Sequence, residues 1–319
     1  MSNEVRLFTT EGKELIIRKK RRRFKLTLED VIIDTIIYIL LIFLCVVTIY
    51  PFLNTLALSL NDAIDTVRGG IYIWPRRFTL RNYQLIFTVN PLIFRALFNS
   101  GARALLGGTV SVFACMCVAY VFSRKDFVMR RYFTPFLVFT MYFSGGLIPT
   151  FLLMRDLGLI NNFWVYILPL VISAYNVMVM RSFIENIPDS LIEAAKIDGA
   201  SEYTILFKIV FPLSTPVIAT IFLFVSVLQW NSWFDTMIYC SGEPKLTTLQ
   251  FELQKLLTSA QSMSASDSMD AAGNLDGRAV TPMSLRTAMT IIAVAPILFI
   301  YPFLQRYFVK GLTIGGVKG

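Results

Sequence analysis

Six apolar stretches of membrane-spanning length dominate this sequence. Each approaches or exceeds the ~20 residues that an α-helix needs to cross a bilayer. Their number and length predict an all-α polytopic membrane protein with six transmembrane helices. The stretches are Val31–Leu53, Ala96–Phe122, Tyr132–Met154, Phe163–Phe183, Leu213–Ile238 and Ala288–Gln305.

Polar residues are too scarce to cover a water-soluble domain of this size. Hydrophobic residues make up 55% of the 319 positions and charged residues 16%, whereas soluble domains carry charge on roughly a quarter of their positions. Histidine is absent, which excludes Ser-His-Asp catalysis and His-ligated metal sites. Glycine-rich phosphate-binding motifs are absent as well. We therefore expect a non-enzymatic chain that binds no metal or cofactor and takes its energy from another protein.

Basic residues indicate the orientation of the spans. Much of the net charge of +9 lies in the run Arg18–Arg23, just before the first apolar stretch. Such a block is typical of the cytoplasmic side of a membrane, next to anionic lipid, so we expect no nucleic-acid partner. The turn of residues 124–131 holds four basic residues and the turn of residues 155–162 only one. This bias predicts that both termini are cytoplasmic. One feature disagrees, because the first outer loop contains four arginines: Arg68, Arg76, Arg77 and Arg81.

This topology divides the chain into three parts. Residues 1–30 are predicted to be a cytoplasmic basic arm, residues 31–305 the six-span transmembrane domain and residues 306–319 a cytoplasmic tail. Within the domain, residues 185–212 form a cytoplasmic loop and residues 240–287 an extracytoplasmic one. The outer loop includes Ser259–Asp276, a segment without aliphatic periodicity, which we expect to be flexible or to become ordered on a partner.

A short helix is predicted in the cytoplasmic loop. Ser190 and Glu193 have the S-x-x-E spacing of a capping box, which starts a helix. Gly199 can adopt the left-handed conformation that ends one, and Ser201 is placed to cap a second helix. Between these ends, the small side chains of Ala194 and Ala195 allow another protein to approach closely. The carboxylates of Glu193 and Asp198 offer charged contacts beside them.

This segment resembles the EAA loop of ABC-importer permeases. The matching residues are Glu193-Ala194-Ala195, Asp198-Gly199-Ala200 and then Phe207, Pro212 and Pro216, in the order expected for that family. In the family this loop is a coupling helix that fits a groove on the ATPase subunit. The resemblance therefore implies that residues 193–200 contact an ATPase. The alternative interpretation is an amphipathic surface helix that only joins two spans.

The resemblance covers most of the chain after residue 90. Residues 143–150, 176–181, 230–233 and 301–319 look like the MalG-like permeases of carbohydrate importers, in the group similar to LplC that serves polysaccharide-derived oligosaccharides. This implies the type I importer permease fold and a location in the bacterial cytoplasmic membrane. The implied partners are a second homologous permease, an ATPase dimer that binds ATP and Mg, and an extracytoplasmic sugar-binding protein.

The C-terminal tail permits two interpretations. By resemblance to MalG-like permeases, Gly315, Gly316 and Lys318 would reach toward the ATPase dimer interface. By itself, the segment of residues 310–319 is too rich in glycine for a stable helix and is typical of a frayed chain end.

Polar and aromatic residues in the fifth stretch are candidates for a substrate path. Ser226, Gln229, Trp230 and Trp233 recur at helical spacing, and Asn231 and Asp235 lie close by. Hydroxyl partners and flat aromatic faces suit a sugar, and an intramembrane carboxylate should face a cavity or a polar partner. The alternative is a tryptophan belt at the depth of the lipid headgroups.

Weaker candidates for the path are Asn176 in the fourth stretch and, in the third, Tyr142, Ser144, Gly145 and Gly146. In the third stretch, Gly145-Gly146 followed by Pro149 would kink a helix or allow close helix packing.

Two other functions are considered. A self-contained secondary transporter would need internal repeats or an intramembrane proton relay, and the sequence shows neither. An intramembrane enzyme would need a nucleophile–base pair or a metal cluster, for which the spans offer only Asp235 and scattered serines.

Overall fold

The structure is a computed structural model that describes residues 4–8, 14–18, 28–262 and 281–316. The chain forms two compact units, Met1–Phe52 and Leu53–Gly319. In the described part, three helices are long and apolar enough to cross a membrane, and up to six spans result if each of three bent helix pairs counts as one. The predicted helical membrane architecture is confirmed, with some of its spans bent.

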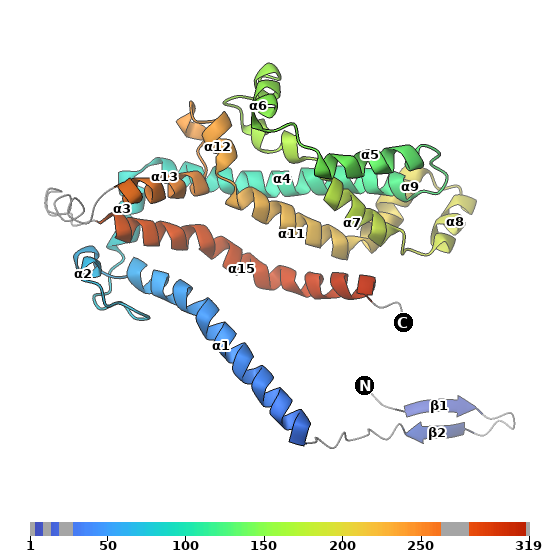
Figure 1. Cartoon of the computed structure of the whole chain (residues 1–319). Helices are drawn as coiled ribbons and strands as arrows, with labels where there is room; N and C mark the ends of the chain where they lie inside the picture. Colours follow the sequence, from blue (N-terminus) through green and yellow to red (C-terminus); the bar gives the residue numbers. More distant parts are fainter. Residues whose placement is uncertain (1–3, 9–13, 19–27, 263–280, 317–319) are drawn as a thin grey trace. The chain divides into compact units, whose positions relative to one another are not determined.

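The first unit contains a β-hairpin and most of a long helix (Figure 1). β1 (Glu4–Phe8) and β2 (Glu14–Arg18) pair antiparallel, with Glu4 opposite Arg18. The hairpin lies within the N-terminal arm, for which no strands were predicted. α1 (Leu28–Ser59) has 32 residues, so it extends about 48 Å and is long enough for a hydrocarbon core of about 30 Å.

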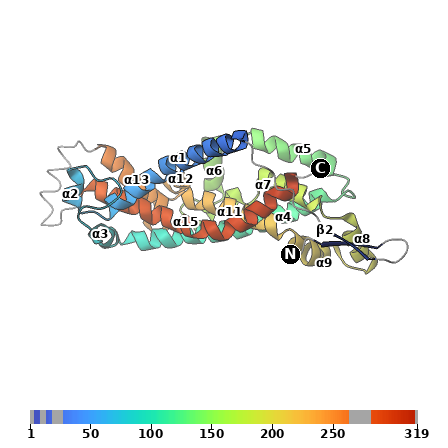
Figure 2. The ribbon, with the colours of Figure 1, turned by 90° about the horizontal axis from the view of Figure 1, so that it is seen from below.

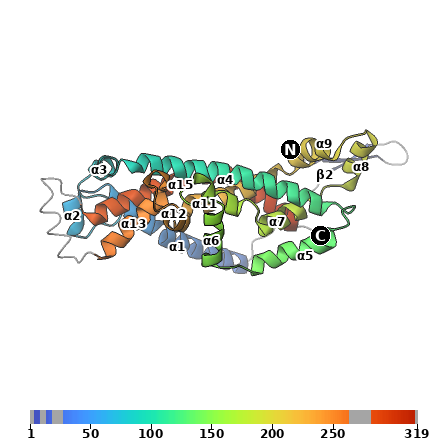
Figure 3. The same ribbon diagram turned by 90° about the horizontal axis from the view of Figure 1, so that it is seen from above.

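α4 is the central helix of the second unit. It runs from Leu92 to Ser123 without a proline and packs along α11 (Thr215–Asn231) and α7 (Ala174–Ile184) (Figure 3). α15 (Pro282–Gly316) packs against α11 and against α13 (Leu249–Ser262) (Figure 2). Most of the apolar core therefore forms around α4 and α11.

The close approach of α4 and α11 depends on two glycines. A Cβ on Gly107 would lie 2.9 Å from the side-chain nitrogen of Gln229, and a Cβ on Gly108 would lie 2.5 Å from the Ser226 hydroxyl. Small residues at a helix interface let two backbones approach closely, which is the usual way that membrane helices gain packing contacts.

The three bent pairs correspond to the third, fourth and fifth apolar stretches. α5 (Arg130–Tyr142) and α6 (Leu147–Asp156) meet at 113°, the 163–170 segment and α7 at 51°, and the 202–213 segment and α11 at 78°. Gly146 has φ +87° and would have no neighbour within 4 Å of a Cβ. The predicted kink at Gly145-Gly146 is thus confirmed, and within this chain Gly146 makes no close helix contact.

The fifth stretch was expected to be continuous to residue 238, and this is wrong. α11 ends at Asn231, and the separate helix α12 (Phe234–Tyr239) begins after an extended Ser232. The remaining elements are α2 (Ala63–Val67), α3 (Arg81–Val89), η1 (Phe163–Tyr166), η2 (Leu168–Leu170), α8 (Asp189–Ile197), α9 (Glu202–Ile205), the π-helix η3 (Leu206–Val210), α10 (Phe211–Leu213) and η4 (Pro244–Leu246).

The prediction that residues 310–319 are too glycine-rich for a helix is wrong as far as Gly316. α15 continues through Gly315 and Gly316, because extending an existing helix costs far less than nucleating one. Lys318 and most of Ser259–Asp276 lie outside the described residues.

Candidate functional site

The strongest sequence candidate, the loop of residues 185–212, contains α8 and α9, which lie at one end of the second unit, and continues through η3 into α10. α8 and α9 lie at this end, whereas α2, α3 and α13 lie at the opposite end (Figure 1). α8 begins directly after Pro188, whose side chain offers no capping hydrogen bond. The predicted capping box is therefore wrong, because Ser190 lies inside the first turn of α8 and does not precede it.

α8 ends as the sequence predicts. Gly199 has φ +78°, its N–H donates to the Lys196 carbonyl at 3.0 Å, and the Ala200 N–H donates to the Ala195 carbonyl at 2.9 Å. These two bonds are the Schellman motif, in which a left-handed residue terminates the helix. The predicted cap of the second helix is also confirmed, since the Ser201 hydroxyl accepts a hydrogen bond from the Thr204 N–H at 3.3 Å.

The two faces of α8 differ in exposure. Ile192 is 3% exposed and belongs to the apolar core around α4, and Ala195 packs against that core. The opposite face carries exposed side chains at helical spacing, including Ile197 at 87% exposure. That face consists of Ser190, Glu193, Ala194 and Ile197, followed beyond the helix by the exposed Asp198 and Gly199. This face therefore combines one large apolar side chain with small and charged ones, all of them accessible to another protein.

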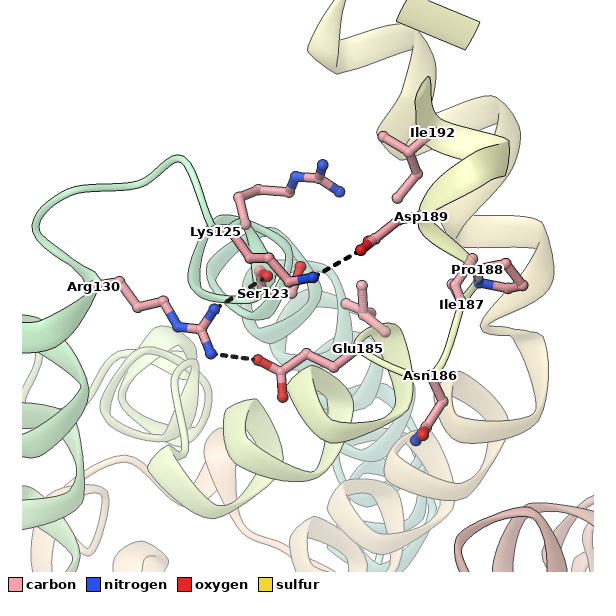
Figure 4. A pocket seen from close by; sticks show the side chains of 11 residues that line it. Ser123, Lys125, Arg130, Glu185, Asn186, Ile187, Pro188, Asp189 and Ile192 are labelled. Atoms are coloured by element: carbon pink, nitrogen blue, oxygen red, sulfur yellow. Dashed lines mark hydrogen bonds and ion pairs between the residues drawn. The ribbon is translucent and has the colours of Figure 1, made fainter. Parts of the chain in front are cut away.

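Two ion pairs lie where α7 leads into α8, beside a cavity of about 480 Å³, and one of them holds the first residue of α8 (Figure 4). The Lys125 ammonium donates to Asp189 at 2.8 Å, and the Arg130 guanidinium donates to Glu185 at 2.8 Å. The hydrogen bond with Lys125 lowers the pKa of Asp189, and the same bond raises the pKa of Lys125.

A second polar cluster lies between α4, α11 and α12. Arg103 is fully buried, and its guanidinium donates to the Gln229 side-chain oxygen at 2.7 and 3.0 Å and pairs with Asp235. The same guanidinium lies 4.4 Å from the centre of the Tyr166 ring. The Gln229 side-chain NH₂ donates to the Tyr166 carbonyl at 2.8 Å. A buried arginine is tolerable here because a carboxylate and neutral acceptors satisfy it.

Comparison with known proteins shows the family. Residues 74–314 match the family model described as "Binding-protein-dependent transport system inner membrane component". The chain belongs to this family. Its members are the membrane components of transport systems that use a separate binding protein, so the resemblance seen in the sequence is confirmed.

Individual relatives of this permease cover nearly its whole length. It is 36% identical to the polygalacturonan/rhamnogalacturonan transport system permease protein YtcP of Bacillus subtilis, over 90% of this chain and 98% of the relative. It is also 36% identical to protein LplC of Bacillus subtilis, over 86% and 90% of the two chains. Among solved structures, it resembles a bacterial ABC transporter involved in importing the acidic polysaccharide alginate, with 27% identity, TM-score 0.80 and coverage of 88% and 98%.

The structure places the predicted substrate-path residues of the permease in different surroundings. Gln229 is 1% exposed, and its amide bonds to Arg103 and Tyr166, so it does not face a path in this conformation. Asp235 has the polar partner that we expected, which is Arg103. The Trp230 indole N–H donates to the Ala293 carbonyl of α15 at 2.9 Å, which makes this side chain a link between α11 and α15.

The other candidates retain more exposure. Asn231 is exposed and accepts a hydrogen bond from the Gln250 side chain at 3.1 Å, and Trp233 is half-buried against Phe234. Tyr142 is 85% exposed at the end of α5, and Asn176 is 7% exposed in the first turn of α7. Within the described residues, no hydrogen bond joins Tyr142 or Asn176 to the Arg103 cluster.

Arg103 is a key residue that our sequence analysis did not identify. It is the single charged residue in the apolar stretch Ala96–Phe122. A buried charge in a membrane span requires a partner of opposite sign, and Asp235 in the fifth stretch carries that sign. This signal was available in the sequence, although it does not reveal that Gln229 is the second partner.

Proposed function

We propose that this permease is one of two homologous membrane subunits of an ATP-driven importer of oligosaccharides or polysaccharide fragments. It catalyses no covalent step, and the ATP and Mg bind to a dimer of partner ATPase subunits. An extracytoplasmic binding protein delivers the sugar. The observation that carries the proposal is the exposed face of α8, which stands at one end of a membrane domain of the matching family.

The α8 face has the properties that a docking helix needs. It is anchored through Ile192 and the ion pairs of Asp189 and Lys196, so the face with Glu193, Ala194 and Ile197 remains accessible. Ala194 is small and exposed on that face, and Ile197 offers an apolar side chain for burial. Burying such a residue contributes about 1.5–3 kcal/mol. The residues proposed to contact the ATPase are Glu193, Ala194, Ala195, Asp198, Gly199 and Ala200.

We place this end of the molecule in the cytoplasm of a bacterial cell. The arm of residues 1–30 and the tail of residues 306–319 then lie on the same side, and the loop of residues 240–287 lies outside the membrane. Supporting this orientation, the 124–131 turn that contacts α8 contains four basic residues. In this arrangement Gly315, Gly316 and Lys318 extend toward the ATPase dimer.

The names of the relatives support a carbohydrate substrate. They include transport system permeases for polygalacturonan/rhamnogalacturonan and, in Halalkalibacterium halodurans, for arabinooligosaccharides, and a structure involved in alginate import. These are all saccharides of polysaccharide origin. Of the predicted path residues that are exposed or half-buried, we assign substrate contact to those bonded neither to Arg103 nor to α15: Tyr142, Asn231 and Trp233.

Replacing Ala194 with Trp tests the docking surface. Because Ala194 is exposed, we expect the variant to fold and to insert normally, while the bulky side chain prevents co-purification of the ATPase. The matched control is Asp156→Trp, an exposed position on α6, which should leave the ATPase bound. Undiminished ATPase binding by the Ala194 variant would show that α8 is not the docking helix.

The substrate class is tested separately with the binding protein that supports uptake. Neutral and acidic oligosaccharides are compared for their ability to raise its melting temperature and to drive uptake into proteoliposomes. Stabilisation and uptake by a non-carbohydrate ligand alone would refute the assignment.

A further inference from the structure

The Glu202 carboxylate joins three parts of the chain at the cytoplasmic end of the proposed importer. Glu202 is the first residue of α9. It accepts a hydrogen bond from the Tyr120 hydroxyl of α4 and one, at 2.9 Å, from the Lys196 ammonium of α8. Lys196 also pairs with Asp126 in the turn after α4, at 3.6 Å. This single carboxylate thus connects α8, α9 and α4.

The Lys196–Glu202 pair closes the turn between α8 and α9. Lys196 precedes Gly199 and Glu202 follows it, so the ion pair spans the left-handed turn from both sides. The Schellman bonds fix the backbone of the same turn. The Schellman bonds therefore set the backbone geometry of the segment from residue 196 to residue 202, which we call the α8–α9 elbow, and the ion pair bridges its two ends.

The Tyr120 bond is the hydrogen-bonded link from this elbow into the protein core, beside the apolar packing of Ala200. Tyr120 is 5% exposed and packs in the cluster that contains Ala119, Phe122 and Ile205, so its ring is held in the core that α4 forms with α9. In contrast, the side chains of Lys196 and Glu202 are 37% and 53% exposed. The exposed ion pair can rearrange at little cost, whereas the buried phenol defines where the elbow meets α4.

α4 extends from this link to the Arg103 cluster. It is 32 residues long, contains no proline and continues unbroken through Gly107 and Gly108, which lie between Arg103 and Tyr120. At 1.5 Å per residue, these two residues are about 26 Å apart along the axis. A shift of the elbow that moves Tyr120 therefore also moves the arginine that binds Gln229 and Asp235.

We propose that the Tyr120–Glu202 hydrogen bond is the joint through which α8 moves α4 during transport. This inference rests on the proposed function of α8 and goes beyond it, since it names the element that receives the movement. Tyr120 and Glu202 are positioning residues that touch neither substrate nor nucleotide. Loss of the joint should uncouple transport from ATP hydrolysis without releasing the ATPase.

The test is Tyr120→Phe in the complete importer, reconstituted in proteoliposomes with its partner permease, ATPase and binding protein. The substitution keeps the ring in the core and removes only the hydroxyl. We expect ATPase binding and basal hydrolysis to be retained, while sugar imported per ATP falls by at least about tenfold, the lower end of the range for one hydrogen bond to a charged group. The matched control is Tyr132→Phe, which removes the hydroxyl of a 63% exposed tyrosine on α5 and should leave the ratio unchanged.

Two substitutions of Glu202 separate the joint from the ion pair. Glu202→Gln keeps an acceptor for Tyr120 but loses the charge that faces Lys196, and it should retain most of the coupling. Glu202→Ala should uncouple like Tyr120→Phe, and the double variant should be no worse than either single one. Because Glu202 is exposed, Glu202→Ala decides the question even if the Tyr120 variant does not fold.

An unchanged import-to-hydrolysis ratio in Glu202→Ala overturns the proposed joint, as do additive effects in the double variant. Both results leave the docking role of α8 intact, because the ATPase remains bound. If the wild-type protein binds no ATPase, the proposed function fails and the joint fails with it.

Discussion

Replacing Gly199 with Val tests how far the function depends on the left-handed turn after α8. Gly199 has φ +78°, and a Cβ built on it would meet no atom within 4 Å. The variant therefore has space for its side chain, and its cost comes from the backbone alone. An L-residue pays roughly 1–2 kcal/mol to occupy the left-handed region, and a β-branched one is least tolerated there.

We expect this cost to appear in the affinity for the ATPase. If docking requires the native turn, 1–2 kcal/mol corresponds to an affinity about 5–30-fold weaker. Sugar uptake and stimulated ATP hydrolysis should fall with it, while membrane insertion is retained. Titration of the ATPase into the purified permease in nanodiscs measures the affinity directly, and Gly199→Asn should show a smaller loss because asparagine tolerates this conformation.

Gly158 provides a matched control. It ends α6 with φ +68°, has no atom within 4 Å of a built Cβ, and takes part in the same pair of backbone bonds, from Gly158 to Arg155 and from Leu159 to Met154. Gly158→Val carries the same backbone cost away from α8 and should leave ATPase affinity unchanged. The reasoning is refuted if Gly199→Val binds the ATPase like the wild type, or if both variants weaken binding equally.

Three further predictions concern the ion pairs and Trp230. Arg103→Met leaves Asp235 without its partner and should cost about 3–5 kcal/mol of stability, which is measured as a lower melting temperature in detergent. Adding Asp235→Leu should restore much of that stability. An unaltered melting temperature in Arg103→Met would contradict the prediction. The stabilisation of α8 by the Lys125–Asp189 pair should be constant from about pH 5 to pH 10. It should be lost in acid, as the pH falls through the lowered Asp189 pKa, and in base, as the pH rises past the raised Lys125 pKa. Hydrogen exchange of α8, corrected for intrinsic rates, measures this stabilisation, and a transition near neutrality would be inconsistent with the prediction. Trp230→Phe should lose about 1 kcal/mol of stability with its bond to α15 and keep normal uptake kinetics, so impaired uptake at full stability would instead assign Trp230 to the substrate.

The features that depend on neighbouring residues alone were the ones that the sequence predicted correctly. The apolar stretches predict the spans because a minimum helix length is a property of the chain segment itself. The end of α8 at Gly199 and the cap at Ser201 follow equally from local backbone chemistry. The start of α8 was not predicted correctly, because the Ser190–Glu193 capping box competes there with Pro188. Pro188 sets the extended backbone before the helix, and Asp189, which pairs with Lys125, becomes its first residue.

The environment of Gln229 could not be predicted because it depends on distant contacts. Its partner Arg103 is 126 positions away in the sequence. Gln229 and Trp230 are adjacent in a helix, so their side chains point about 100° apart, and α11 has a different neighbour in each direction. Gln229 therefore faces α4, while Trp230 faces α15. Helical spacing predicted that both residues share one broad face of α11. It could not show that α4 packs against one side of that face and α15 against the other.

The assignment of Gln229 and Asp235 to the core of this chain changes which residues are available to a sugar. A saccharide binds through hydroxyl groups and needs unoccupied donors, acceptors or aromatic faces. The Gln229 amide is occupied by Arg103 and Tyr166, and taking it from them would leave a buried guanidinium with a missing acceptor, which costs more than a sugar hydroxyl regains. Exposed side chains such as Tyr142 carry no such penalty. For this reason the substrate surface should be sought on exposed residues and on the facing permease, and the Arg103 cluster should be treated as the scaffold that holds α4, α11 and α12 in place.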